Sequence, residues 1–147
     1  MEKEEKFRQI MIRIGKILCA DQDYLVYNIE DTKEEKPHDE GMATWEEFWG
    51  YYTAKDLCGQ KCASCGILLN DDNIVGAHIR FVGEEDGTKD AWIAMFCKGC
   101  NNSRRPQKVT EGSWVVKTTM EKVHKNVKPV NCDLDRHAAL LAIANGA

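Results

Sequence analysis

The hydrophobic pattern of the amino-terminal stretch fits two periods at once. Apolar residues recur at helical spacing across residues 2–18, whereas Ile10, Ile12 and Ile14 also alternate as they would in a strand. The acidic start and the length of the run favour a helix. Gly15 lies within the run and weakens a helix by about 1 kcal/mol relative to alanine. We therefore predict a helix over residues 2–18.

A second helix is predicted from Thr44 to about Leu57. Thr44 and Glu47 are spaced as in a capping box, in which a hydroxyl and a carboxylate satisfy free N–H groups of the first turn. Cys58 and Gly59 follow as a stop, because glycine readily adopts the left-handed conformation that ends many helices. Four aromatic residues share one face of this helix and predict that the face packs in the core: Trp45, Phe48, Trp49 and Tyr52.

Shorter apolar runs predict strands and a polar loop. Runs rich in β-branched and aromatic residues predict strands at 24–29, 74–82, 92–96 and 113–119. The highly charged stretch 30–41 contains Pro37 and predicts an exposed loop. Residues 120–128 have a mixed, basic pattern that allows a helix, and residues 133–145 have the acidic first turn and the propensity of a C-terminal helix.

Composition narrows the class of protein. A chain of 147 residues is the size of one domain, and we divide it into an N-terminal region (1–58), a central module (62–105) and a C-terminal extension (106–147). No apolar run is long enough to span a membrane and the charged start leads into no export signal, which predicts a soluble, cytoplasmic protein without a membrane partner. The formal net charge is −4, yet residues 96–128 are strongly basic, which favours either a polyanionic partner or a solvated face.

The cysteines carry the clearest chemical pattern in the chain. Seven cysteines without an export signal favour thiolates over disulfides. Four of them form two Cys-x-x-Cys pairs, Cys62 with Cys65 and Cys97 with Cys100. Each pair can turn two sulfurs toward one ion, and two pairs complete the tetrahedral site of a structural Zn²⁺. For the other three we predict only packing as small hydrophobic residues: Cys19, Cys58 and Cys132.

Between the two cysteine pairs, side-chain alternation brings two functional side chains together. If residues 74–82 form a strand, His78 and Arg80 lie on the same face. We expect both side chains to project toward solvent as a unit. A lone histidine on a strand is more often structural than catalytic, so this pattern by itself leaves the role of His78 open.

The order of these parts resembles the zinc-bearing treble-clef form of the HNH nuclease superfamily, over residues 62 to about 105. The matching segments are Cys62-Ala-Ser-Cys65, Ala77-His78-Ile79, Trp92-Ile-Ala-Met-Phe96 and Cys97-Lys-Gly-Cys100-Asn101-Asn102. The resemblance implies an α+β fold, in which a small ββα-like zinc module is joined by flanking helices and a short sheet. Ala77 stands where the family usually has an acid or a histidine that binds the catalytic metal.

The resemblance also implies roles for individual side chains. His78 would be the general base that activates water. Asn101 would be a ligand of a second, catalytic Mg²⁺ or Mn²⁺ ion. Arg104 and Arg105 would hold phosphates, while Pro106 would keep the helix that carries Asn101 short.

Three functions remain open for such a module. The preferred one is nucleic-acid binding with weak, altered or lost cleavage, in which basic side chains contact phosphates. The second is an active metal-dependent endonuclease that uses His78. The third is a protein-interaction module, such as an inhibitor or an adaptor, whose acidic first half binds a basic protein partner. The basic residues assigned to nucleic acid are Arg80, Lys98, Arg104, Arg105 and Lys108.

Overall fold

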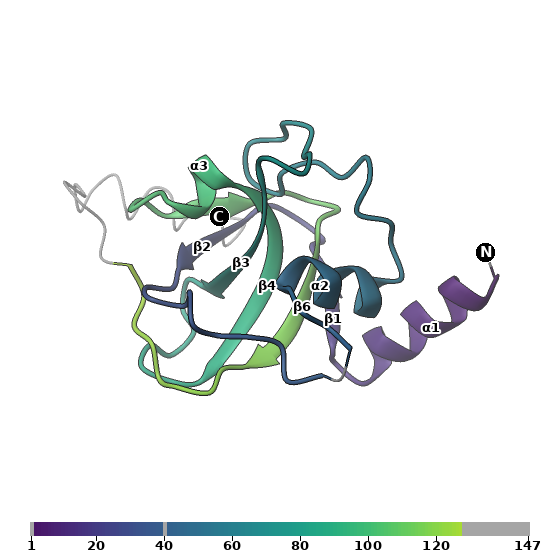
Figure 1. Cartoon of the computed structure of the whole chain (residues 1–147), viewed down its shortest axis with the longest axis horizontal. Coiled ribbons are helices and arrows are strands. Elements are labelled where there is room, and N and C mark those ends of the chain that lie inside the picture. Colours follow the sequence, from purple (N-terminus) through teal and green to yellow (C-terminus); the bar gives the residue numbers. More distant parts are fainter. Residues whose placement is uncertain (1, 40, 128–147) are drawn as a thin grey trace.

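The computed structural model describes residues 2–39 and 41–127, which form an α+β fold around one curled antiparallel sheet (Figure 1). In chain order the elements are α1 (Glu2–Arg13), β1 (Ile17–Cys19), β2 (Tyr24–Asn28), α2 (Trp45–Thr53), β3 (Ile74–Phe81), β4 (Asp90–Cys97), α3 (Lys98–Asn101), β5 (Gln107–Val109) and β6 (Trp114–Thr119). The six strands lie in the order β1-β6-β4-β3-β2-β5, so strands from all three predicted regions alternate in one sheet. None of the helices in the described ranges is long and apolar enough to cross a membrane.

Helix α1 ends earlier than predicted, and the chain turns into an edge strand. Gly15 adopts a left-handed conformation with φ of 79°. The amides of Gly15 and Lys16 donate to the carbonyls of Ile12 and Met11 at 3.0 and 2.9 Å, which is the Schellman pattern that closes a helix. The prediction of one helix over residues 2–18 is therefore wrong at its end. Helix α1 has no buried residue and projects from the body of the fold (Figure 1).

Helix α2 begins where the capping pattern predicts and ends several residues early. The Thr44 hydroxyl accepts from the Glu47 amide at 3.2 Å. Ala54 takes the left-handed conformation, with φ of 53°, and Arg8 of α1 donates to the carbonyls of Thr53 and Ala54. These contacts with a distant segment close the helix before the predicted stop. The aromatic face packs on β3, β4 and β6 as predicted, with three of its members buried: Trp45, Phe48 and Trp49.

The β3–β4 hairpin is the centre of the sheet, and most of β3 is buried on both faces. Residues 76–80 are all buried, although alternation alone predicts one solvent-facing side. Gly76 allows α2 to approach closely, since a Cβ atom at this position would lie 2.6 Å from the Cβ atom of Trp45. The Gly76 amide also donates to the Glu46 carboxylate at 3.0 Å. Helix α2 thus covers the face of β3 that carries His78.

The segment after β6 is held by tertiary contacts instead of helical hydrogen bonds. Residues 120–127 contain no helix, so the helix considered for this segment is wrong over its described part. The amides of Glu121 and Lys122 donate to the carboxylate of Glu35, at 2.8 and 3.2 Å. Strand β5 was not predicted, because three residues are too few to show an alternating pattern. The helix predicted over 133–145 lies outside the described residues.

Candidate metal centre and adjoining groove

The four cysteines of the two Cys-x-x-Cys pairs meet at one point of the fold. Their Sγ atoms all lie within 4.8 Å of one another. Those of Cys65 and Cys97 are 3.8 Å apart. A tetrahedral metal–thiolate site with bonds of about 2.3 Å separates its sulfurs by about 3.8 Å. The cluster therefore has the donor set and the spacing of a four-cysteine metal site.

Backbone amides point at the sulfurs and favour the thiolate form. Cys62 is 2 % exposed, and its Sγ atom accepts from the amides of Cys65 and Cys97 at 3.5 and 3.3 Å. The Sγ atom of Cys97 accepts from the Cys100 amide at 3.4 Å. Burial raises the pKa of Cys62, but the amide donors outweigh burial and lower this pKa to about 7. The backbone amides thus make it easier for Cys62 to lose its proton when a metal binds.

The first cysteine pair is attached to the sheet through its own backbone. The Cys62 amide donates to the Ile67 carbonyl at 2.8 Å, and Gly66 takes a positive φ of 81° that returns the chain. The Ala63 amide donates to the carbonyl of Met95 in β4 at 2.8 Å. These bonds place the first pair beside the end of β4, where the second pair begins.

Asn28 holds the second cysteine pair in place, a role that was not predicted from the sequence. It ends β2 and is buried, and its Nδ2 atom donates to the carbonyls of Cys100 and Ser103 at 2.9 and 3.1 Å. These two carbonyls lie at the end of α3 and directly after it, so Asn28 ties this end of the helix to β2. A single polar residue in the apolar run 24–29 was the available signal.

His78 is buried instead of facing solvent. It is 5 % exposed, and its ring packs edge-to-face on Trp45 with centroids 4.6 Å apart. Burial lowers the pKa of His78 to about 4, and among the described residues its Nε2 atom has no hydrogen-bond partner. The imidazole is therefore neutral near pH 7 and is a much weaker base than an ordinary histidine. The expectation that His78 projects toward solvent is wrong, because α2 covers this face of β3.

We expect this buried imidazole to make the fold less stable in acid. The folded-state pKa of about 4 lies below the ordinary 6.5, so between these pH values the unfolded chain binds more protons at His78. As the pH falls through this window, protonation of His78 in the unfolded chain lowers the free energy of unfolding by about 3 kcal/mol. His78→Gln abolishes the titration, so urea unfolding at several pH values should show wild type losing that amount relative to the variant. A difference that does not change with pH would contradict the buried, neutral state.

A buried contact between a carboxylate and an imidazole anchors the charged loop next to His78. The Glu35 carboxylate lies 2.8 Å from Nε2 of His124, and both side chains are largely buried. Burial raises the pKa of Glu35, but the amides of Glu121 and Lys122 and the ring of His124 reverse this, so the pKa is lowered overall. The pair joins residues 89 positions apart, which is why no local pattern in the sequence indicated it.

Two adjoining cavities beside the metal centre form one groove, which we name the Asn101 groove. Both cavities are lined by Thr32, Lys33 and Asn101. One cavity, of about 260 Å³, is also lined by the buried His78 and the start of α2, and we name it the deep cavity. The other, of about 330 Å³, is also lined by the exposed Arg104 and the segment that follows α3, and we name it the outer cavity. The groove thus brings together three residues that the sequence predicted as functional.

The predicted phosphate contacts divide into groove and surface residues. Arg104 lies in the groove, is 57 % exposed and pairs with Glu30 at 3.7 Å. Lys108 is exposed and pairs with Asp23 at 3.6 Å. Lys98 and Arg105 are exposed and line neither cavity of the groove.

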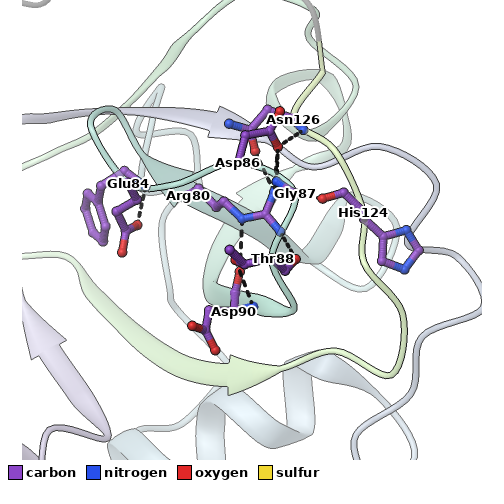
Figure 2. Close-up of polar contacts among 9 residues, drawn as sticks. Arg80, Glu84, Asp86, Gly87, Thr88, Asp90, His124 and Asn126 are labelled. Carbon is purple, nitrogen blue, oxygen red and sulfur yellow. Dashed lines mark hydrogen bonds and ion pairs between the residues drawn. The ribbon is translucent and has the colours of Figure 1, made fainter.

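Arg80 is a buried structural residue, contrary to the expectation that it faces solvent. It is 1 % exposed, and Figure 2 shows its guanidinium enclosed by the turn after β3 and the segment at 124–126. Its donors bond to five acceptors: the carbonyls of Thr88, Asp90 and His124, the carboxylate of Asp86 and the side-chain oxygen of Asn126. Since its hydrogen bonds are satisfied inside the protein, Arg80 offers no donor to a phosphate on the surface.

The described residues contain no second cluster suited to a catalytic ion. Within residues 2–39 and 41–127, the four cysteines are the only group of three or more His, Cys, Asp or Glu side chains close enough to hold an ion. Hard ions such as Mg²⁺ and Mn²⁺ need several oxygen ligands. Asn101 supplies one amide oxygen, which is too few by itself.

Comparison with known proteins leaves the chain without an assigned relative. No protein-family model matches it. No curated protein and no solved structure matches it either. The resemblance to HNH nucleases therefore stays a prediction from the sequence of residues 62–105.

Proposed function

We propose that this chain is a zinc-stabilised, treble-clef-like module that binds nucleic acid and does not cleave it. Zinc suits four thiolates at tetrahedral spacing. A first cysteine pair, the β3–β4 hairpin and a second pair at the start of α3 follow one another along the chain. That order supports the treble-clef arrangement and places Cys100 and Asn101 side by side in one helix.

The observation that carries the proposal is the Asn101 groove. Its outer cavity offers Lys33 and Arg104 for phosphates, while its deep cavity offers hydrogen-bonding groups. The pair between Arg104 and Glu30 is more than one-third exposed on both sides, so it is worth at most about 1 kcal/mol and exchanges readily for a phosphate. The charge of the whole chain is −4, so binding depends on this local arrangement and weakens with salt.

Two features argue against cleavage. A general base near neutral pH works best with a pKa close to that pH, whereas burial holds the pKa of His78 at about 4. Acidic residues line the groove, but among the described residues no three of them lie close enough together to hold a hard divalent ion. Zinc here stabilises the fold and orients α3.

Fluorescence anisotropy with labelled oligonucleotides tests the binding. We expect an affinity that falls steeply between about 50 and 200 mM salt. Arg104→Gln should weaken binding several-fold and make the log–log salt slope shallower by about 1, because it removes one phosphate contact. Arg13→Gln is the matched control, since it makes the same charge change on α1, at an exposed position outside the groove. Equal effects of the two variants, or no binding by wild type, would reject the proposal.

Protein interaction is a second candidate, favoured by the apolar surface of α1. Ile10 is 48 % exposed on this projecting helix, and Ile14, directly after its end, is 67 % exposed. In that case the chain should pass through a DNA column without salt-dependent retention. Adding Mg²⁺ or Mn²⁺ to the protein with plasmid tests the nuclease alternative, which requires that wild type cuts the plasmid and His78→Ala does not.

A further inference from the structure

The deep cavity of the Asn101 groove has the chemistry of a site for a neutral group. The His78 ring lines it and has a buried Nε2 atom without a partner among the described residues. Burial lowers the pKa of this imidazole to about 4, so near pH 7 the ring carries no charge and can donate or accept one hydrogen bond at Nε2. A buried polar atom without a hydrogen-bond partner destabilises the folded protein, and a ligand that supplies the partner removes this cost.

The other walls of the deep cavity also disfavour a phosphate. The carboxyl-bearing residues Glu35 and Glu46 line it, whereas Lys33 and Lys36 are exposed side chains at its rim. An anion in the cavity would meet these carboxylates in a partly desolvated place, which costs free energy. The outer cavity is lined by Glu30 and Asp31 as well as by Lys33 and Arg104. Of the two cavities it is the one with a guanidinium, which can bond a phosphate through two donors, so a phosphate fits beside Arg104.

Two further groups fit a flat, hydrogen-bonding ligand. Asn101 also lines the cavity, and its side-chain amide carries both hydrogen-bond donors and an acceptor. Trp45 supplies an aromatic wall next to His78. A cavity of about 260 Å³ is smaller than the sites that hold drug-sized molecules, which suits a ligand of one heterocycle.

We propose that the deep cavity binds one unpaired nucleobase, hydrogen-bonded by His78 and Asn101, while the strand backbone passes Arg104 in the outer cavity. This inference rests on the proposed function and adds that the ligand is single-stranded. A base within a duplex has its pairing edge occupied and cannot enter a cavity of this size without leaving the stack. The Nε2 atom is buried in this conformation, so binding includes a movement that opens it to the cavity.

The test compares three labelled ligands of one sequence at one salt concentration: a single strand, its duplex, and the single strand with abasic sites. The abasic strand keeps every phosphate and lacks only the bases. We expect wild type to bind the intact strand about tenfold or more tightly than the other two, the range expected when hydrogen bonds to a base edge are lost.

Two variants locate the effect in the cavity. Asn101→Ala and His78→Gln should each lower the preference for the intact strand toward unity while leaving the salt slope unchanged. Asn101 is only partly buried in a four-residue helix, so its variant remains informative if His78→Gln folds poorly. Arg104→Gln should do the opposite, with a shallower salt slope and an unchanged preference.

The outcomes separate this inference from the function on which it rests. Salt-dependent binding with equal affinity for all three ligands would overturn the base site and leave nucleic-acid binding intact. A preference that survives in both cavity variants would also overturn the base site. Absence of binding to any of the three ligands would reject the inference together with the proposed function.

Discussion

Replacement of Cys62 by serine is expected to release the metal and to unfold the sheet, whereas Cys58→Ser should leave both unchanged. Cys62 is buried in the four-sulfur cluster, and its sulfur accepts hydrogen bonds from the backbone amides of Cys65 and Cys97. A structural zinc contributes on the order of 10 kcal/mol to folding, which is comparable with the whole stability of a domain of this size. Loss of one ligand therefore removes most of the free energy of unfolding.

Elemental analysis and circular dichroism measure the two effects. Wild type and Cys58→Ser should each carry one zinc per chain and show the same cooperative unfolding in urea. Cys58 is the matched control because it is an exposed cysteine that precedes Cys62 by only four positions. A strong chelator added to wild type should reproduce the Cys62→Ser spectrum. Purified wild type without bound metal, or a Cys62→Ser variant of wild-type stability, would refute the metal centre.

Arg80→Met should destabilise the fold by about 3–5 kcal/mol, because a buried guanidinium ties two segments to the sheet. Its five acceptors belong to the turn between β3 and β4, to the first residue of β4 and to the segment that follows β6 (Figure 2). Methionine fills a similar volume but donates no hydrogen bond, so three carbonyls and two side-chain oxygens lose the hydrogen bond from Arg80. The cost is dominated by these unsatisfied groups, since Asp86 itself is half exposed.

Urea unfolding monitored by tryptophan fluorescence checks this loss. Arg104→Met is the control, since it makes the same substitution at a largely exposed side chain and should change the unfolding free energy by no more than about 0.5 kcal/mol. Hydrogen exchange should also accelerate at residues 83–89 in Arg80→Met, because the turn loses its attachment to the core. The structural role of Arg80 would be disproved by matching stabilities of the two variants.

The cluster of four cysteines could be predicted from the sequence because its information is local. Two cysteines separated by two residues face one ion whatever surrounds them, and a hairpin between two such pairs brings them together. The capping pair at Thr44 and Glu47 and the aromatic face of α2 are local in the same sense. In contrast, Gly15 ends α1 by adopting the left-handed conformation, with φ of 79°. Helix propensity counts a glycine only as destabilising and does not predict that the helix ends there.

The surroundings of His78 and Arg80 could not be predicted in this way. Alternation correctly places the two side chains on one face of β3, but it does not say what covers that face. The cover comes from Trp45 on a preceding helix and from the segment at 120–127, both distant in the chain. Burial then changes the expected chemistry, since it makes the imidazole a much weaker base and encloses the guanidinium among internal acceptors.

The sequence alone therefore determined the elements whose signals lie within a few residues: the cysteine pairs, the central hairpin and the start of α2. The tertiary structure decided which face of the hairpin is buried, which basic residues remain on the surface, and that Asn101 and Arg104 share a groove with His78. The physical reason is that solvation and pKa depend on neighbours that arrive from far along the chain, whereas turns, caps and ligand spacing depend on the residues next to them.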